Sequence, residues 1–284
     1  MPLVNPMQML EKARQEGFCI GAFNVVDYLS IEAVVVAAEQ CNAPVIVQTS
    51  SATIKRFGIE KIVTMAKMAA EKSPVPICLH LDHGTDIEVI NEAIDKGYTS
   101  VMIDASKFPL EENIAISRQV VEAAGKKGVA VEGEVGVVAG VEDDIVVNAD
   151  DAIYTTPEEA IEFQSRSGVD FLAAAIGTAH GFYKVAPKLN IETLRAIRER
   201  TEFPLVVHGG TGLSPDIVKE LVKSGAAKFN VSTQIKQTYI DSLYGYIQGK
   251  RNEYNIIKVL DHAKTELAEM IAGYITLLGG NNKA

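Results

Sequence analysis

The sequence is poor in cysteine, in basic residues and in long apolar runs. Its three cysteines, Cys19, Cys41 and Cys78, are odd in number and show no C-x-x-C spacing. This pattern argues against a disulfide framework and against a four-cysteine zinc site. We expect all three to be buried thiols in a reducing compartment.

Basic residues are outnumbered, with 27 Lys and Arg against 37 Asp and Glu and a formal net charge of −10. Binding to nucleic acid or to an anionic membrane needs clustered Lys and Arg, so the charge argues against both partners. A small anionic substrate is not excluded, because backbone N–H groups can bind phosphate inside an acidic protein.

Apolar runs that could span a bilayer are lacking as well. The longest run near the end, residues 270–278, is too short. The first residues show no basic region followed by an apolar stretch, so no signal peptide is visible. We therefore expect a cytoplasmic protein that does not bind a membrane.

The sequence does contain a regular alternation of short apolar runs and amphipathic segments. The runs are rich in Val, Ile and Phe and predict eight strands, at residues 18–24, 45–49, 77–82, 100–104, 129–135, 169–176, 205–207 and 227–231. The segments between them predict helices at residues 30–42, 59–72, 87–96, 111–127, 157–167, 191–200 and 214–224.

This alternation predicts parallel strands joined by crossovers, and eight units in 284 residues are typical of an α/β (β/α)8 TIM barrel. A doubly wound open sheet is the alternative, but no G-x-G-x-x-G follows the first strand. No linker is visible, so residues 1–284 are predicted to form a single domain with extra C-terminal helices. We expect these helices to begin near Thr233 and to break at Gly245 and Gly249.

Local signals mark several helix starts and one long loop. Ser30, Asp86 and Ser214 are predicted N-caps, and Pro157 and Pro215 suit a first helical turn. Residues 136–156 are acidic and non-periodic, which is typical of a lid or binding loop.

Polar residues stand at or just beyond the C-terminal end of every predicted strand. In a barrel these ends meet on one face, where active sites are built. A different polar residue at each of eight ends is hard to explain by folding needs alone. The residues are Asn24, Ser50, Asp82 with His83, Asp104, Glu134, His180, His208 and Asn230.

Three of the five histidines, His83, His180 and His208, are each followed by glycine, which lets a ligand approach closely. Three histidine ligands with an open fourth position are typical of catalytic zinc. The alternative for any one of them is an ordinary core or surface role. We assign such roles to the other two histidines: His80 packs inside the barrel, and His262 is structural.

Carboxylates surround the predicted metal ligands. Asp82 adjoins His83 and suits general acid/base chemistry, or else orients a histidine. Asp104 and Glu134 complete a second metal position or support the first. Glu132 shares a strand face with Glu134, so the two are easily confused.

Two glycine- or hydroxyl-rich segments predict a phosphate site. The segment at 208–212, HGGTG, precedes a predicted helix, and Asn230-Val231-Ser232-Thr233 ends the eighth strand before another. Backbone N–H groups at helix N-termini bind anions, and the loops after strands seven and eight are the usual phosphate site of barrels.

Together these motifs resemble the class II fructose- and tagatose-bisphosphate aldolases, along nearly the whole chain and in the same order. They are Asn24, LDHG at 81–84, VMIDAS at 101–106, VEGEVG at 131–136, GTAHG at 177–181, HGGTG at 208–212 and Asn230-Val231. The resemblance implies cleavage of a phosphorylated ketose to dihydroxyacetone phosphate and an aldehyde. It implies zinc or another divalent cation, leaves a monovalent cation open, and implies a homodimer or homotetramer packed through the terminal helices.

The resemblance also implies roles for individual residues. His83, His180 and His208 would bind the metal, Asp104 and Glu134 would form an alternative position, Asp82 would exchange a proton with the C4 hydroxyl, and Glu142 would be the mobile base. Substrate would be bound by Asn24, Ser50, Gly181, Gly209, Gly210, Thr211, Asn230, Val231, Ser232 and Thr233.

One motif departs from the family. Where the family commonly has Tyr-Asp-Pro-Arg, with the arginine on the distal phosphate, this chain reads YNIIK at 254–258, so Ile257 replaces the arginine. We expect dihydroxyacetone phosphate as one product, with a partner aldehyde that need not be glyceraldehyde 3-phosphate. Arg251, Lys55 or Arg56 could restore the charge by another route.

Two rival functions stay open. A metal-dependent sugar isomerase or hydrolase could use the same barrel, although it would more often show extra bridging carboxylates or an H-x-H after the first strand. A non-enzymatic scaffold would more often have lost the ligands or the base.

Overall fold

Eight parallel strands form a closed barrel in the computed structural model, which describes residues 3–142, 145–148, 152–183 and 187–284. The strands follow one another around the barrel in chain order, and β1 closes it by pairing with β11 from Ile20↔Lys228 to Phe23↔Val231. The barrel strands are β1 (Ile20–Asn24), β2 (Val45–Thr49), β3 (Ile77–Gly84), β4 (Ser100–Ile103), β5 (Ala130–Val135), β8 (Phe171–Ala174), β10 (Leu205–Val207) and β11 (Ala226–Val231).

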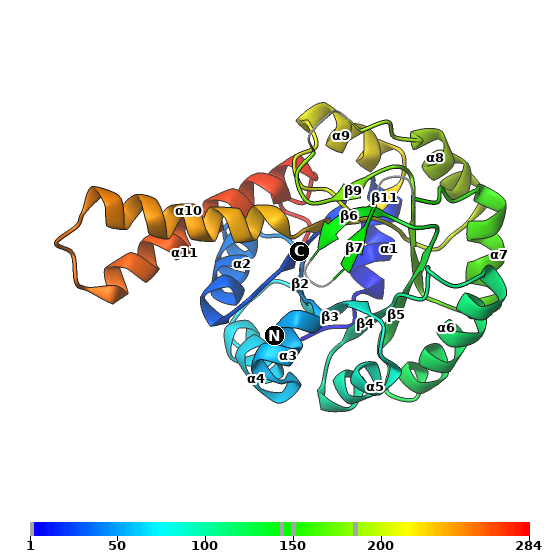
Figure 1. The fold of residues 1–284 in the computed structure, drawn as a ribbon, viewed down its shortest axis with the longest axis horizontal. Helices are drawn as coiled ribbons and strands as arrows, with labels where there is room; N and C mark the ends of the chain where they lie inside the picture. Colours follow the sequence, from blue (N-terminus) through cyan, green and yellow to red (C-terminus); the bar gives the residue numbers. More distant parts are fainter. Residues whose placement is uncertain (1–2, 143–144, 149–151, 184–186) are drawn as a thin grey trace.

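Helices surround the barrel, as Figure 1 shows. They are α1 (Met7–Glu16), α2 (Tyr28–Cys41), α3 (Ser51–Phe57), α4 (Ile59–Ala70), α5 (Ile87–Lys96), α6 (Leu110–Gly125), α7 (Pro157–Ser167), α8 (Ile191–Arg200), α9 (Pro215–Lys223), α10 (Thr233–Gly249) and α11 (Ile256–Leu277). The predicted (β/α)8 barrel with additional C-terminal helices is confirmed. All eight predicted strands form, because parallel strands covered on both faces are continuous apolar runs that stand out in the sequence.

Most predicted helix starts are correct. Asp86 and Ser214 cap α5 and α9, and proline occupies the first turn of α7 and α9. The prediction for Ser30 is wrong by one turn: Asp27 is the N-cap of α2, and Ser30 is the third helical residue, which completes a capping box with it.

Helix α1, which the sequence did not predict, covers the N-terminal end of the barrel. Its buried residues Met9, Leu10 and Ala13 pack against Phe18 and against the lowest inward-facing side chains of the strands. This end is therefore filled with apolar side chains, and the opposite end is left for polar ones.

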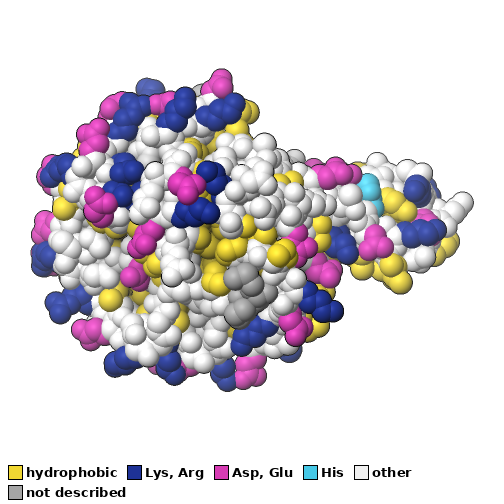
Figure 2. All heavy atoms as spheres, turned by 180° about the vertical axis from the view of Figure 1, so that it is seen from behind, with side chains coloured by type: hydrophobic (Ala, Val, Ile, Leu, Met, Phe, Trp, Pro, Cys, Tyr) yellow, Lys and Arg dark blue, Asp and Glu magenta, His cyan; other side chains and the backbone are white. Residues whose placement is uncertain are grey.

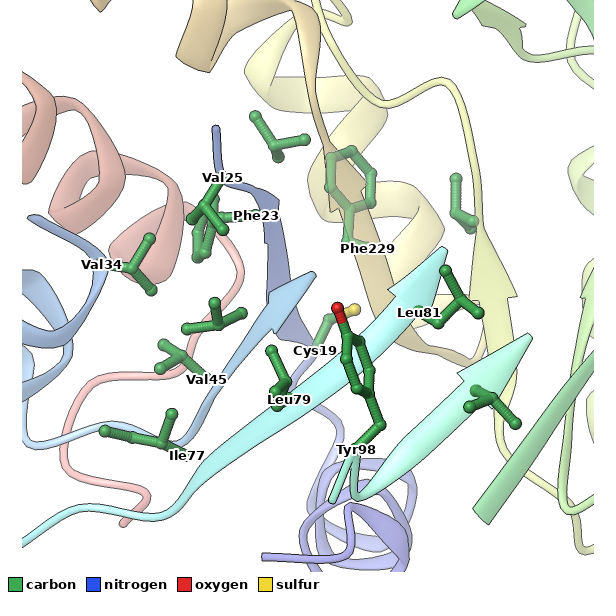
Figure 3. Packing of buried hydrophobic residues seen from close by; sticks show 14 of the residues in the cluster. Cys19, Phe23, Val25, Val34, Val45, Ile77, Leu79, Leu81, Tyr98 and Phe229 are labelled. Atoms are coloured by element: carbon green, nitrogen blue, oxygen red, sulfur yellow. The ribbon is translucent and has the colours of Figure 1, made fainter. Parts of the chain in front are cut away.

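Outside the strands, a continuous apolar layer holds the helices. Figure 3 shows Phe23 of β1 close to Val34 of α2, and Phe229 of β11 is buried in the same cluster. Tyr98 is buried in the same layer, and its hydroxyl lies 2.7 Å from Thr49 Oγ1. Because the packing fixes the strands from outside, the inward-facing side chains need not all be apolar.

The segment from 136 to 156, predicted as a non-periodic loop, contains two short strands. β6 (Ala139–Glu142) pairs antiparallel with β7 (Ile145–Val147) and parallel with β9 (Ala179–His180). Gly140 lies so close to His180 that a methyl group in its place would overlap the His180 backbone. Strand β6 is therefore hydrogen-bonded beside His180 at the mouth of the barrel.

Helices α10 and α11 project from the barrel as an arm (Figure 1). Contrary to the prediction, Gly245 lies within α10, whereas Gly249 ends it as expected. Apolar patches cover part of the arm in Figure 2, and its exposed large apolar residues are Ile240, Tyr244, Ile247, Tyr254, Ile256, Ile257 and Leu260. Within the described residues, no helix is both long enough and apolar enough to cross a membrane.

Candidate active site

The strand ends bring polar residues together at the mouth of the barrel. Asn24, Asp82 and Glu134 belong to β1, β3 and β5, and Asn230 belongs to β11. All four are buried, as are His83, His180 and His208. His180 was expected just beyond the strand at 169–176; it lies instead on the separate short strand β9, beside the segment that crosses the mouth.

The three histidines converge. One nitrogen of each lies within 4.8 Å of a nitrogen of the others. His83 Nε2 is 3.0 Å from His208 Nδ1. Two nitrogens bound tetrahedrally to one zinc ion at about 2.0–2.1 Å would lie about 3.3 Å apart. The imidazoles are therefore spaced as ligands of a single ion.

Two of these histidines each have a carboxylate on the side of the ring that faces away from the other histidines. Asp104 Oδ2 is 2.8 Å from His83 Nδ1, and Glu132 Oε1 is 2.8 Å from His208 Nε2. A carboxylate behind a histidine fixes the ring and its tautomer and is the usual support of a metal ligand. The remaining nitrogens, His83 Nε2 and His208 Nδ1, are those that face each other. This donor set fits a divalent metal.

Asp82 is held between two side-chain amides. Asn24 Nδ2 donates to its Oδ2 at 2.8 Å, and Asn230 Nδ2 donates to its Oδ1 at 3.2 Å. Burial alone would raise the pKa of Asp82, but the neighbouring His83 and Lys228 charges lower it below its ordinary value. The side chain is therefore a fixed carboxylate that can accept a proton.

His83, Asp104 and Glu134 form a second cluster of close ligand atoms that shares His83 with the first. Burial and the Asp104 charge raise the pKa of Glu134 well above its ordinary value. Its Oε2 is buried and makes no hydrogen bond within the described residues, although it lies 3.3 Å from His208 Nδ1. A cation in this cluster would satisfy that oxygen, so the set fits the alternative metal position expected from the sequence.

The backbone at His83 is unusual. Its φ of +47° lies in the left-handed region, and the pairing of β3 with β4 shifts register between Leu81 and Gly84. Non-glycine residues rarely adopt this conformation, and strain of this kind is concentrated at functional sites. The irregularity turns the histidine toward the other two.

The predicted phosphate residues line one pocket beside His180. Its lining is Gly181, Gly209, Gly210, Thr211, Asn230, Ser232 and Thr233. The pocket lies at the start of α10, where Ser232 makes no side-chain capping bond and its buried Oγ has no hydrogen-bond partner in the described part of the chain. An anion there would meet free backbone N–H groups.

Tyr183, which the sequence did not single out, holds this pocket to the histidine strand. Its hydroxyl donates to the Gly209 carbonyl at 2.6 Å and accepts from the Ala179 N–H at 2.9 Å. Burial raises the pKa of Tyr183 to about 12, so the phenol keeps its proton. A lone tyrosine two residues after Gly181 gave no local signal of this role.

Two predicted substrate residues and the predicted base are placed less directly. The hydroxyl of Ser50 accepts the Thr53 N–H as the N-cap of α3. The Val231 side chain is buried in the outer core, which leaves only its backbone for a ligand. Glu142 ends β6, but its side chain lies outside the described part of the structure.

The structural predictions for the other histidines agree with their surroundings. His80 is fully buried, with Nδ1 2.8 Å from Ser100 Oγ and Nε2 3.3 Å from Glu132 Oε2. The ring of His262 lies 4.9 Å from that of Tyr246, which joins the two helices of the arm.

Known proteins resemble this chain over its whole length. Residues 4–283 match the family described as fructose-bisphosphate aldolase class II. Fructose-bisphosphate aldolases of Staphylococcus aureus and Helicobacter pylori are 39% and 36% identical, covering 100% and 99% of both chains in each comparison.

Solved structures agree. The YdjI aldolase from Escherichia coli K12 superposes with a TM-score of 0.88 at 30% identity, covering 99% of each chain. The fructose-bisphosphate aldolase of Campylobacter jejuni gives a TM-score of 0.86 at 25% identity, covering 100% of this chain and 97% of that one.

Proposed function

Because the chain belongs to the class II fructose-bisphosphate aldolase family, we propose that it reversibly cleaves a phosphorylated ketose to dihydroxyacetone phosphate and an aldehyde. The observation that carries this proposal is the convergence of His83, His180 and His208 beside the buried carboxylate Asp82. Metal ligands and a proton acceptor then lie within one small volume, as cleavage of a carbon–carbon bond next to a carbonyl requires.

The family implies a divalent metal, and we propose zinc held by the three histidines. A divalent cation there would stabilise negative charge on the substrate oxygens as the bond breaks. The carboxylates Asp104 and Glu132 would keep the ligand nitrogens turned inward. Asp104 and Glu134 would offer the alternative position, next to His83.

Asp82 would carry the proton of the reacting hydroxyl. In cleavage, the C4 hydroxyl gives its proton to Asp82, the C3–C4 bond breaks, and C4 becomes the aldehyde carbon. The electron pair passes into the three-carbon fragment, which Glu142 then protonates at C3. The amides of Asn24 and Asn230 hold Asp82 in position for this transfer.

The pocket at the start of α10 would bind the phosphate of the three-carbon fragment. Its backbone N–H groups and the Ser232 hydroxyl offer donors without a positive side chain. This explains how a chain with a net charge of −10 can bind a sugar phosphate.

The aldehyde half of the substrate is the part in which this chain departs from the family. Ile257 stands at the start of α11 on the projecting arm, 70% exposed, where the common family motif has arginine. We therefore propose a ketose 1-phosphate, or another sugar without a distal phosphate, as an alternative to fructose or tagatose 1,6-bisphosphate.

A retro-aldol assay tests both levels of the proposal. Release of triose phosphate should be abolished by EDTA and restored by zinc. Comparison of kcat/KM for fructose 1,6-bisphosphate, tagatose 1,6-bisphosphate and fructose 1-phosphate then identifies the substrate class. Chelator-resistant cleavage would contradict the metal mechanism, and a strong preference for a bisphosphate would contradict the altered specificity.

We also propose a homodimer or homotetramer built through the arm. Seven large apolar residues are exposed on α10, α11 and their connection. Clustered exposed apolar side chains commonly mark protein interfaces.

A further inference from the structure

A lysine lies inside the barrel directly below the candidate metal site. Lys228 of β11 is fully buried, and its Nζ lies 2.9 Å from Glu132 Oε2 and 2.7 Å from Asn230 Oδ1. Burying an ammonium group is costly unless it is paired and hydrogen-bonded. Here it is paired, and its two partners lead to two different parts of the site.

We propose that Lys228 is a positioning residue that fixes both the metal-facing nitrogen of His208 and the donor side of Asn230. The inference rests on the proposed function, since it assigns His208 to the metal and Asp82 to proton transfer. It concerns a residue that touches neither substrate nor metal and acts through its two partners.

The first branch runs through Glu132. Lys228 holds one carboxylate oxygen, and the other lies 2.8 Å from His208 Nε2. An oxygen of a carboxylate can only accept, so His208 carries its proton on Nε2. Nδ1 then presents its lone pair toward His83 Nε2, 3.0 Å away. Glu134 Oε2 also faces Nδ1, but at the longer distance of 3.3 Å, so the shorter contact to Glu132 places the proton. Lys228 and Glu132 therefore fix the His208 tautomer that leaves Nδ1 available to a metal.

The second branch runs through Asn230. An ammonium group has only donors, so the atom of Asn230 that faces it must be the carbonyl oxygen. The amide nitrogen is then turned to Asp82 Oδ1 at 3.2 Å. With the amide reversed, a carbonyl oxygen would face the Asp82 carboxylate and repel it. Lys228 thereby selects the orientation in which Asp82 is held by a donor.

An equivalent pair of hydrogen bonds orients the amide that contacts the other oxygen of Asp82. Gln48 Nε2 donates to Asn24 Oδ1 at 2.6 Å, which turns the Asn24 amide nitrogen to Asp82 Oδ2 at 2.8 Å. One continuous chain of hydrogen bonds, completed by the ion pair between Lys228 and Glu132, therefore runs from Gln48 through Asp82 and Lys228 to His208. Each link has one orientation because the lysine at its centre cannot accept a hydrogen bond.

The test compares Lys228→Met, the double variant Lys228→Met/Glu132→Gln, and Cys78→Ala. The single variant leaves the Glu132 carboxylate buried without its cation and is expected to be destabilised. The double variant removes both charges and keeps the side-chain volumes similar. Cys78→Ala is the matched control, because Cys78 is a buried inward-facing residue outside this chain of hydrogen bonds.

We expect the folded double variant to bind zinc about 10- to 100-fold more weakly in chelator competition, as loss of support behind a ligand does. Nitrogen-15 spectra of its histidines should show both tautomers of His208, and kcat should fall more than KM rises. Cys78→Ala should match the wild type in zinc affinity and kcat. A folded double variant with wild-type zinc affinity and a single His208 tautomer would overturn the proposal.

The wild-type protein supplies a second test that does not depend on the variants folding. Its metal-free His208 should show the Nε2–H tautomer in long-range nitrogen-15 spectra, and a dominant Nδ1–H form would also overturn the proposal. If the wild type cleaves no ketose phosphate, the proposed function fails, while the tautomer and zinc measurements still decide the role of Lys228.

Discussion

His83 differs electrostatically from the other two histidines of the triad. Burial opposes its protonation, but the Asp82 charge and the hydrogen bond to Asp104 raise the pKa of His83 well above its ordinary value. Burial lowers the pKa of His180 and His208 well below theirs. In the metal-free protein at neutral pH, His83 is therefore the ring that carries a second proton and a positive charge.

We expect zinc binding at pH 7 to release about one proton, because a histidine ligand must be neutral. The sign follows from the raised pKa: zinc affinity should increase with pH up to the folded-state pKa of His83 and level off above it. Calorimetric titrations in buffers of different ionisation enthalpy count the proton. Asp104→Asn should release less, and proton-neutral binding by the wild type would contradict the assignment.

The cysteines give a second prediction for single residues. Burial raises the pKa of Cys78 to about 12, and Cys19 is buried as well. Cys41 is only half-buried, which corrects the expectation that all three are buried. With a thiol reagent at pH 8, Cys41 should react first and the other two only after unfolding. Three equal rates in the native protein would refute this.

The residues that could be predicted from the sequence are those in local motifs at strand ends, such as His83 and His208. Their supporting residues were harder to find, because they act across the barrel. Glu132 and Lys228 stand in the middle of strands that are not neighbours, and only their charge within apolar runs hinted at a role. Which histidine nitrogen faces which carboxylate depends on this long-range pairing.

At the scale of elements, replacing each of two glycines by alanine is predicted to have opposite effects. Gly209 has φ +66°, and a methyl group there would overlap the Ala179 backbone. Gly209→Ala should therefore displace the loop that Tyr183 ties to the histidine strand, raising KM for the sugar phosphate at least tenfold. Steady-state kinetics and zinc content measure the effect.

The control is Gly245→Ala, in the interior of α10 with no neighbour within 4 Å of the added carbon. It should stabilise the helix by about 0.5–1 kcal/mol, since glycine loses more backbone freedom than alanine on folding. Urea unfolding measures this change. Equal effects of the two substitutions on KM would show that Gly209 has no special conformational role.

Elements were predictable where their signal is local. The strands are apolar runs, and α5, α7 and α8 were placed to the residue. Helix α1 begins at Met7, and its N-cap Pro6 makes no side-chain capping bond. Helix α3 is only 7 residues long, so neither helix had a clear signal in the sequence. The strands β6 and β9 are short and owe their existence to pairing with each other, 40 residues apart in the sequence.

At the scale of the whole molecule, the arm projects from the barrel and exposes large apolar side chains. If it joins copies of the chain, Ile247→Asp should dissociate the assembly, because Ile247 is 53% exposed on α10 and a buried carboxylate is costly. Light scattering coupled to size-exclusion chromatography measures the mass. Met68→Asp, at 59% exposure on α4 and away from the arm, should leave the mass unchanged.

A monomeric wild-type protein would contradict this prediction. The sequence indicated terminal helices, but their projection from the barrel follows from where α11 returns to pack on α2 (Figure 1). That return depends on contacts between segments more than 200 residues apart, which no local pattern contains.

The left-handed backbone of His83 lowers the stability of the fold but places a side chain that the reaction needs. Glycine or asparagine would adopt that conformation with less strain. If variants of this protein are selected for thermal stability alone, without selection for activity, substitutions of this histidine should therefore appear early. The selected variants would be more stable barrels without catalytic activity.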